Sequence, residues 1–390
     1  MAERRGVASM ARPRGKLVWM HGASVGEALA LLPLVARLRA SGYGVLMTTG
    51  TVTSARILAQ RLPEGALHQY LPLDAPPFVK SFLANWHPDL SILSESELWP
   101  NLMLEARERG IPIVLVNARL SERSYKRWRR ASRLVRELLS TVDLCLAQTD
   151  MDAERFTALG ATRVDICGNL KFDAAPLPVR LTELANLRAA LGTRQCWIAA
   201  STHAAEEQII LDAHKSLLGR FPRLLTILAP RHPDRGSAIR VKASAHGIRV
   251  AARSKAEAIT AETQLYLCDT IGELGLLYRL DVPVFLGKSL AGTGGQNPIE
   301  PAQLGAAILH GPSVANFAAV YAELDNAGGA EVVFDGADLA THVASLFTDA
   351  DARVALARRA VAVLGKHVGA SERIMRRLAP YLAAKAEATV

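Results

Sequence analysis

The stretch from residue 287 to 305, GKSLAGTGGQNPIEPAQLG, has the residue types of a nucleotide-phosphate site. Its five glycines allow tight turns and a close approach of the backbone to a ligand. Asn297, a good N-cap, and Pro298, favoured at a first helical position, predict a helix start, with Ile299 and Glu300 in its first turn. Such a start suits a phosphate, and the Glu300 carboxylate could accept hydrogen bonds from two ribose hydroxyls. A purely structural glycine-rich turn before a capped helix explains the same residues equally well.

In the first half of the chain, ionisable side chains follow apolar runs that read as strands. Glu27 follows LVWMHG, Glu95 and Glu97 follow LSIL, and Lys171 follows VDIC. A carboxylate can take a proton from a hydroxyl, and an ammonium can stabilise developing negative charge. Each also has a structural explanation: Glu27 fits a capping box with Ser24, and the others fit solvated strand ends or an ordinary surface lysine.

The second half repeats this arrangement with different residue types. Ser201-Thr202-His203, Pro230-Arg231-His232-Pro233 and Asp269-Thr270-Ile271-Gly272-Glu273 each follow an apolar run. Polar residues at the strand ends of two facing sheets predict a site, although the PRHPDR turn could also be only a rigid loop.

We predict no metal site. The two histidines His203 and His232 lack metal-ligand spacing. Two D-x-D pairs, at 150–152 and 349–351, resemble those of metal-dependent sugar transferases, but each begins an expected helix, where aspartate is a common cap.

Apolar runs of strand length alternate with helical patterns along the whole chain. Seven such runs lie at 17–22, 44–49, 68–73, 90–93, 111–116, 144–147 and 164–167. Seven more lie at 197–200, 224–229, 248–252, 264–268, 282–287, 306–311 and 331–334. This alternation predicts an α/β fold with parallel sheets. The proline-containing stretch after residue 173 predicts a linker, and hence two Rossmann-like domains, 1–176 and 177–390, with ligands in the cleft between them.

Composition restricts the class of protein. The 390 residues are half apolar and 21% charged, as in a globular protein, with a net charge of +9. The positive charge indicates an anionic partner. Because only 5% of the residues are aromatic and there is no nucleic-acid-binding motif, an anionic small molecule or a membrane surface is favoured over nucleic acid as that partner. The four separated cysteines are expected to be buried free thiols, and no apolar run reaches the roughly 20 residues of a membrane span.

One stretch is densely basic. Between Arg119 and Arg136 there are eight basic residues, interleaved with Tyr125, Trp128, Leu134 and Val135. If helical from Ser124, the stretch has a cationic and an apolar face, as membrane-surface helices do. A surface helix packed by its apolar side fits equally well.

Nine sequence motifs resemble those of the Kdo (3-deoxy-D-manno-octulosonic acid) transferases of Gram-negative lipopolysaccharide assembly, and they occur in the same order. They are HGASVGEALALLPLV, TTGTVTSA, SESELWPNL, NARLSERS, GNLKFD, ASTHAAEE, LAPRHPDR, DTIGELGLLY and GGQNPIEPAQLGAAILHGP. The resemblance covers nearly the whole chain from about residue 4.

This resemblance implies a GT-B fold and metal-free transfer of Kdo, with inversion, from CMP-Kdo to the tetraacylated lipid A precursor, without a cofactor. It implies that the N-terminal domain binds the acceptor and the C-terminal domain the CMP-sugar. Glu27 matches the family's catalytic base, and Glu97 and Lys171 match positions that stabilise the transition state. The CMP-binding segments match these residues: Pro230, Arg231, Ile271, Gly272, Glu273, Asn297, Pro298, Ile299 and Glu300.

The sequence departs from the family pattern at two places. The family usually begins with an apolar membrane anchor, whereas this chain begins near the start of the soluble domain. Either the anchor is absent or Met1 is not the native start. The chain as given is expected to lie peripherally on the cytoplasmic face of the inner membrane. The glycine loop often reads GGS with His before the Asn; here it has Lys288 and Gln296, and Lys288 adds a charge near the expected phosphate.

Three alternative functions remain at this stage. Another GT-B transferase would use a different nucleotide sugar on a membrane acceptor. A dinucleotide-binding oxidoreductase would need G-x-G-x-x-G after the first strand, where the sequence lacks it. A non-catalytic membrane-docking protein would keep the basic stretch without needing Glu27.

Overall fold

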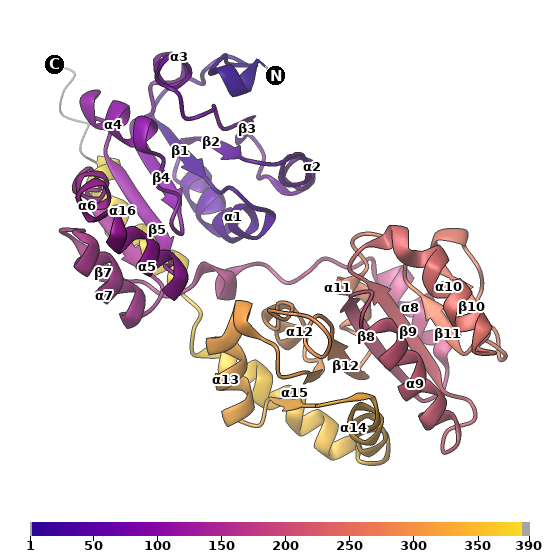
Figure 1. Cartoon of the computed structure of the whole chain (residues 1–390). Helices are drawn as coiled ribbons and strands as arrows, with labels where there is room; N and C mark the ends of the chain where they lie inside the picture. The colour runs from indigo at the N-terminus through magenta and orange to yellow at the C-terminus, as the bar shows by residue number, and fades with distance from the viewer. Residues whose placement is uncertain (1, 384–390) are drawn as a thin grey trace. The chain divides into compact units, whose positions relative to one another are not determined.

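The computed structural model describes residues 2–383 and divides into two compact units (Figure 1). The first unit holds the chain up to Ala175 together with the described residues from His367 onward, and the second is Pro176–Lys366. The predicted boundary after residue 176 lies next to the observed one. The assignment of all of 177–390 to the second domain was wrong, because the last helix returns to the first unit.

The first unit is built on a sheet of seven parallel strands in the order β3-β2-β1-β4-β5-β6-β7. Its strands are β1 Leu17–His21, β2 Gly44–Thr49, β3 Leu67–Tyr70, β4 Leu90–Ser94, β5 Ile113–Ala118, β6 Leu144–Ala147 and β7 Val164–Ile166. Around it lie α1 Val25–Ala40, α2 Val52–Arg61, α3 Pro76–Trp86, α4 Pro100–Glu108, α5 Glu122–Arg130, α6 Ser132–Ser140, α7 Asp150–Leu159 and α16 Ala370–Ala383, with the 3-10 turns η1 Glu3–Arg5 and η2 Leu170–Asp173.

The second unit has its own parallel seven-stranded sheet, in the order β10-β11-β9-β8-β12-β13-β14. Its strands are β8 Cys196–Thr202, β9 Leu225–Pro230, β10 Val250–Ala252, β11 Leu265–Leu267, β12 Pro283–Leu286, β13 Ala307–His310 and β14 Ala330–Val332. Its helices are α8 Leu181–Leu191, α9 Glu207–Leu218, α10 Gly236–Ala245, α11 Leu274–Leu277, α12 Ile299–Gln303, α13 Ala318–Asn326, α14 Gly336–Thr348 and α15 Ala350–Gly365, with η3 Pro233–Arg235, η4 Arg253–Lys255 and η5 Ala315–Phe317. All fourteen predicted strands are present, with ends shifted by a few residues.

Each sheet is buried on both faces, which is why its strands read as continuous apolar runs. In the first unit one core contains Trp19, Phe82 and Trp86, and the core on the other face contains Met20 and Leu31. The second unit has a core around Trp197 and Phe285. Burying one side chain of this size contributes about 1.5–3 kcal/mol, so these cores fix the strand ends on which the polar residues stand.

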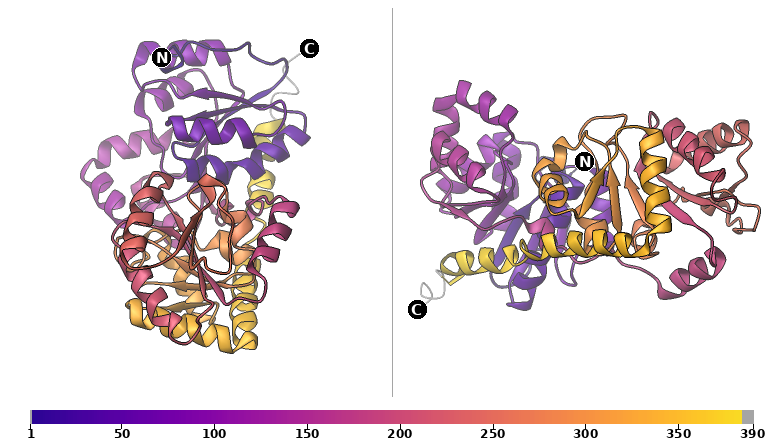
Figure 2. Two further views of the ribbon diagram at one scale, coloured as in Figure 1. Left: turned by 90° about the vertical axis from the view of Figure 1, so that its right-hand side faces the viewer. Right: turned by 90° about the horizontal axis from the view of Figure 1, so that it is seen from below.

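Helix α16 explains the error in the domain prediction. Its residues Ile374 and Leu378 are buried in the same core as α1, and Figure 2 shows the yellow α16 beside the indigo α1. The Asp173 carboxylate accepts hydrogen bonds from the backbone N–H groups of Gly369 (2.7 Å) and Ser371 (2.5 Å). These hydrogen bonds hold the start of α16 against η2, the turn that carries Lys171.

Strand order reverses at one point in each sheet, between β1 and β4 in the first unit and between β8 and β12 in the second. In open α/β sheets, ligands bind beyond the carboxyl ends of the strands at such a switch point. A register shift also interrupts β5 at Asn117 and β8 at Ser201, both of which have positive φ. Such bulges redirect side chains and are common beside binding sites.

Candidate active site

The carboxyl ends of β1 and β4, at the switch point of the first sheet, carry three carboxylates. Glu27 lies in the first turn of the helix after β1, while Glu95 and Glu97 lie in the turn after β4. Glu95 has a φ of 52°, a left-handed conformation that is uncommon for a residue other than glycine. The strain there is typical of functional sites, and the sequence prediction that these residues share one sheet edge is correct.

The predicted capping box at the start of α1 is present, and it engages both oxygens of Glu27. Ser24 Oγ donates to Glu27 Oε1 at 2.6 Å, and the Ala23 N–H donates to Oε2 at 3.0 Å. Burial raises the pKa of the Glu27 carboxyl, and the negative charges of Glu95 and Glu97 raise it further, against the lowering effect of Ser24. A helix-capping role and a base role are compatible, since each carboxylate oxygen has a second lone pair.

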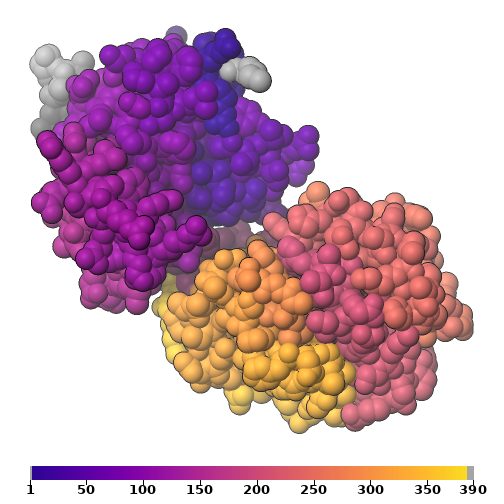
Figure 3. Space-filling view, in the orientation of Figure 1, coloured from indigo at the N-terminus to yellow at the C-terminus, as the bar shows by residue number. Residues whose placement is uncertain are grey.

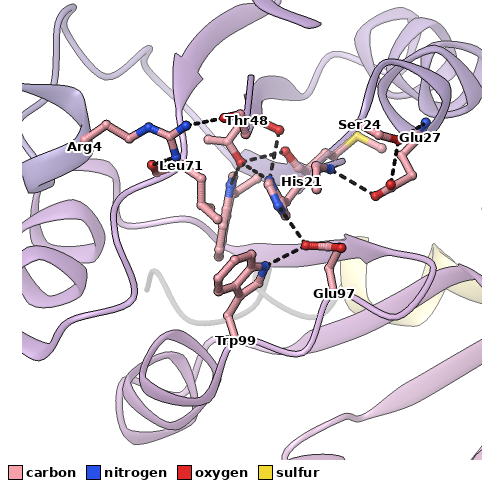
Figure 4. A network of polar contacts seen from close by, with 12 residues as sticks. Arg4, His21, Ser24, Glu27, Thr48, Leu71, Glu97 and Trp99 are labelled. Carbon is pink, nitrogen blue, oxygen red and sulfur yellow. Dashed lines mark hydrogen bonds and ion pairs between the residues drawn. The ribbon is translucent and has the colours of Figure 1, made fainter. Parts of the chain in front are cut away.

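Glu97 is held by two aromatic side chains that the sequence reasoning missed (Figure 4). The Trp99 indole N–H donates to Glu97 Oε2 at 2.9 Å, and Nε2 of the fully buried His21 lies 3.5 Å from the same oxygen. The other ring nitrogen of His21 lies 3.0 Å from both the carbonyl and the hydroxyl of Thr48. His21 thus links the buried strands to the Glu97 carboxylate.

Lys171 also lies at this edge, although it is 76 positions from Glu95 in the chain. Its ammonium is 3.2 Å from Glu95 Oε1. The turn that carries it is fixed by Asn117, whose side-chain oxygen accepts the Leu170 N–H at 2.9 Å. The Asn117 amide nitrogen is buried and has no hydrogen-bond partner among the residues that the structure describes. The structure therefore brings Glu27, Glu97 and Lys171 to one edge of the first unit.

At the switch point of the second sheet, the buried carboxylate of Glu206 organises the glycine-rich loop. It accepts backbone N–H groups from Lys288 at 2.6 Å, Ser289 at 2.9 Å and Leu290 at 3.1 Å. A fourth N–H comes from His203, at 3.2 Å. These loop N–H groups are used within the protein, so a ligand must use others. Gly287 allows the start of this loop to lie close to the backbone of Thr202, because a Cβ at position 287 would be only 2.6 Å from Thr202 Cα.

His203, after β8, contacts Gln296 of the loop. The two side-chain nitrogens lie 3.1 Å apart, so the Gln296 amide donates to a His203 Nε2 that carries no proton. Burial lowers the pKa of His203; Glu206 opposes this, while Lys288, His232 and Arg231 lower it further. The predicted strand-end residues His203, Arg231 and His232 therefore lie together, with Arg231 and His232 exposed at the end of β9.

The predicted helix start differs in detail. Helix α12 begins at Ile299 rather than at Pro298 and has only five residues, and Asn297 Oδ1 accepts the Ile299 N–H at 3.1 Å. A helix of this length supplies little dipole, so a nucleotide site here depends on side chains such as Glu300 rather than on the helix end.

The segment from Ile271 to Glu273 is anchored at one end only. Ile271 is 88% exposed and Gly272 has a φ of 91°, whereas Glu273 Oε1 lies 2.8 Å from Arg253 Nε. Glu273 is therefore paired within the protein, which leaves the exposed tip of the turn open to a ligand.

Each D-x-D pair stands at a helix start, but only the second supplies the cap, because Thr149 caps α7 and Asp349 caps α15. Asp152 is buried and accepts the Leu120 N–H at 2.9 Å and the Thr149 hydroxyl at 2.7 Å, and Asp349 caps α15 through the Ala352 N–H at 2.8 Å. The described residues contain no group of three or more His, Cys, Asp or Glu side chains placed to hold a metal ion. All four cysteines are buried free thiols, as predicted, and burial raises the pKa of Cys145 to about 12.

The basic stretch forms two helices, α5 and α6, which meet at Ala131, instead of one helix from Ser124. Tyr125 and Trp128 pack against the core, so the apolar side of α5 is largely covered, while Leu134 on α6 is 44% exposed. The basic side chains are exposed, and the magenta surface over these helices projects from the first unit (Figure 3). None of the helices described between residues 2 and 383 is long and apolar enough to cross a membrane.

Comparisons with known proteins agree with this architecture. The family model described as 3-deoxy-D-manno-octulosonic-acid transferase matches residues 1–174. The 3-deoxy-D-manno-octulosonic acid transferase of Haemophilus influenzae is 35% identical, over 98% of this chain and 91% of that protein. The one from Bordetella pertussis is 33% identical, over 95% and 88%. A glycosyltransferase structure from Rickettsia africae aligns at a TM-score of 0.63 and 10% identity, over 95% of this chain and 98% of that one.

The two parallel sheets and this structural likeness define an α/β protein with the GT-B fold, as predicted. Within that class, the chain belongs to the family of 3-deoxy-D-manno-octulosonic acid (Kdo) transferases. This assignment replaces the oxidoreductase and docking-protein alternatives.

Proposed function

We propose that this transferase moves Kdo from CMP-Kdo to the lipid A precursor of lipopolysaccharide, with inversion at the anomeric carbon and without a metal or cofactor. In this single displacement, an acceptor hydroxyl oxygen bonds to the anomeric carbon of Kdo. The bond from that carbon to the phosphate oxygen breaks, and its electron pair leaves with CMP. The hydroxyl proton passes to the Glu27 carboxylate.

The observation that carries the proposal is the environment of Glu27. An acceptor hydroxyl has a pKa far above neutrality, so a base must take its proton as the bond forms. Burial and two neighbouring carboxylates raise the pKa of Glu27, which makes it a stronger base than an ordinary glutamate. The Ser24 hydroxyl and the Ala23 N–H fix its orientation.

Glu97 and Lys171 stabilise the transition state, in which positive charge develops on the sugar and negative charge on the phosphate. The hydrogen bond from Trp99 and the contact with His21 support a fixed orientation of the Glu97 carboxyl group. The pairing of Lys171 with Glu95 supports a fixed ammonium at the same edge. Metal independence is supported by the backbone contacts of Asp152 and Asp349: Asp152 accepts the Leu120 N–H, and Asp349 caps α15.

The second unit binds the CMP-sugar through Pro230 and Arg231, through Ile271, Gly272 and Glu273, and through Asn297, Pro298, Ile299 and Glu300. The exposed Arg231 suits the phosphate, and the exposed Ile271 and Gly272 suit contact with the base. Glu300, in the first turn of α12, accepts the ribose hydroxyls.

The acceptor is a lipid, so the enzyme works at the cytoplasmic face of the inner membrane as a peripheral protein. The exposed basic side chains of α5 and α6 provide the attraction to an anionic surface. Because Tyr125 and Trp128 pack inward, this docking is mainly electrostatic, with Leu134 as its apolar contact.

Incubation of the protein with CMP-Kdo and the tetraacylated precursor tests the proposal. Mass spectrometry of the lipid should show one or more added Kdo residues, and transfer from purified CMP-Kdo should persist in EDTA. Turnover of a UDP- or GDP-sugar with none of CMP-Kdo would favour a different nucleotide-sugar transferase. Loss of transfer in EDTA, restored by one metal, would contradict metal independence.

A further inference from the structure

Lys288 has a backbone conformation that suits glycine better than lysine. It lies just beyond β12, at the switch point of the second sheet, and its φ is 60°. An L-residue in this left-handed region places its Cβ too close to the following carbonyl, whereas glycine is free of this penalty. The chain therefore keeps a lysine where the backbone is strained.

The buried Glu206 carboxylate imposes this conformation. It accepts the N–H groups of Lys288, Ser289 and Leu290, at 2.6, 2.9 and 3.1 Å, and it is fully buried. Three consecutive N–H groups on one carboxylate determine the path of the backbone whichever side chain stands at 288. The Lys288 side chain itself is not needed for these bonds, so its retention calls for another reason.

The Lys288 ammonium stands among other positive and hydrogen-bonding groups. Together with Arg231 and His232 it acts electrostatically on His203, whose ring accepts the Gln296 amide. Among the residues that the structure describes, the Lys288 ammonium forms no hydrogen bond or ion pair, and neither does the Arg231 guanidinium. Unpaired cations gathered around one loop favour an anionic ligand.

We propose that Lys288 is a donor-binding residue, whose ammonium pairs with an anionic oxygen of the nucleotide sugar. This inference rests on the proposed function, because CMP-Kdo supplies two such groups, the phosphodiester and the sugar carboxylate. Lys288 thereby adds a second cation to that of Arg231.

Substitutions at 288 separate charge from strain. Lys288→Met removes the charge and keeps the strained backbone, whereas Lys288→Gly removes both. The KM for CMP-Kdo should rise about tenfold in each variant, since a charge-assisted hydrogen bond is lost. The melting temperature should rise by roughly 2–4 °C in Lys288→Gly alone. Lys288→Arg should keep most of the affinity for the donor.

Ala256→Gly is the matched control, because the exposed Ala256 of the same unit has a φ of 53°. It should raise the melting temperature similarly and leave the KM unchanged. Calorimetry with CMP identifies the anionic group: weaker CMP binding by Lys288→Met assigns the phosphate, and unchanged CMP binding with a raised KM assigns the sugar carboxylate. An unchanged KM in both Lys288→Gly and Lys288→Met overturns the proposal. A wild-type protein that does not use CMP-Kdo overturns the proposed function instead.

Discussion

The two sheets carry opposite charges at equivalent places. Beyond β4, one of the two strands at the first switch point, lies Glu95 with a φ of 52°. Beyond β12, one of the two strands at the second switch point, lies Lys288 with a φ of 60°. Glu95 lies with Glu27 and Glu97, whereas Lys288 lies with Arg231 and His232. One edge is thus suited to accepting a proton and the other to holding an anion.

The buried side chains that contact these two strand-end sites also differ in charge. In the first unit, His21 and Trp99 direct ring nitrogens at the Glu97 carboxylate. In the second, the carboxylate of Glu206 is buried and directs the loop N–H groups inward. Similar topology therefore does not imply similar chemistry, because a few side chains at the strand ends decide what each edge binds. The comparison predicts that substitutions in the first unit change the rate and those in the second change donor affinity.

The largest effect is expected for Glu27→Gln. Loss of a general base typically lowers the rate by about 10²–10⁴-fold, while CMP affinity should stay near that of the wild type. Single-turnover transfer and calorimetry measure the two quantities. Ser24→Ala is the control for the capping role, since it removes the cap and leaves the base. It should cost about 1 kcal/mol of stability and much less of the rate. A fast Glu27→Gln enzyme would leave Glu27 as a helix cap only.

The strands were predictable because parallel strands buried on both faces must be apolar throughout. The placement of Glu27, Lys171 and Arg231 at the strand ends was predictable, because each follows such a run in the sequence. His21 and Glu206 were missed because their roles depend on partners distant in sequence. Glu206, for example, contacts residues 82–84 positions away. The apolar pattern of α16 predicts a packed face and says nothing of which core receives it.

The membrane contact should belong to the first unit alone. Replacing Arg127, Arg129 and Arg130 with Ser removes three exposed cations, each worth about 1 kcal/mol near an anionic surface. Binding to anionic vesicles should therefore fall by up to about 100-fold at low salt and less at high salt. Vesicle sedimentation against salt measures this effect, with CMP binding unchanged. Equal sedimentation of both proteins at every salt concentration would leave α5 an ordinary solvated helix.

Glu300→Ala, in the second unit, should change CMP affinity and leave membrane binding as it is. Charge-assisted hydrogen bonds from ribose hydroxyls are worth about 1.5–3 kcal/mol each, so CMP affinity should fall about tenfold or more. Vesicle binding should not change. Glu262→Ala, at an exposed position of the same unit, is the calorimetric control. Unchanged CMP affinity in Glu300→Ala would remove Glu300 from the nucleotide site.

The smallest effect concerns the pH dependence of the first unit, and it tests whether its carboxylates act on one another. Glu27 must be ionised to act as a base, so kcat/KM should fall on the acid side as Glu27 is protonated. The charge of Glu95 raises the pKa of Glu27. Glu95→Gln should lower that pKa and move the acid limb to lower pH, by less than about one unit because the site is partly solvated.

The Lys171 ammonium should act in the same direction, since its positive charge, no longer offset by that of Glu95, favours an ionised Glu27. Glu105→Gln is the matched control, because Glu105, on α4 of the same unit, pairs with Arg109 and is not among the charges that shift the pKa of Glu27. Its acid limb should coincide with that of the wild type. An acid limb that stays in place or moves to higher pH in Glu95→Gln would mean that the rate follows another group. The acidic edge of the first sheet would then owe its carboxylates to the capping of α1 and the pairing of Lys171 rather than to proton transfer.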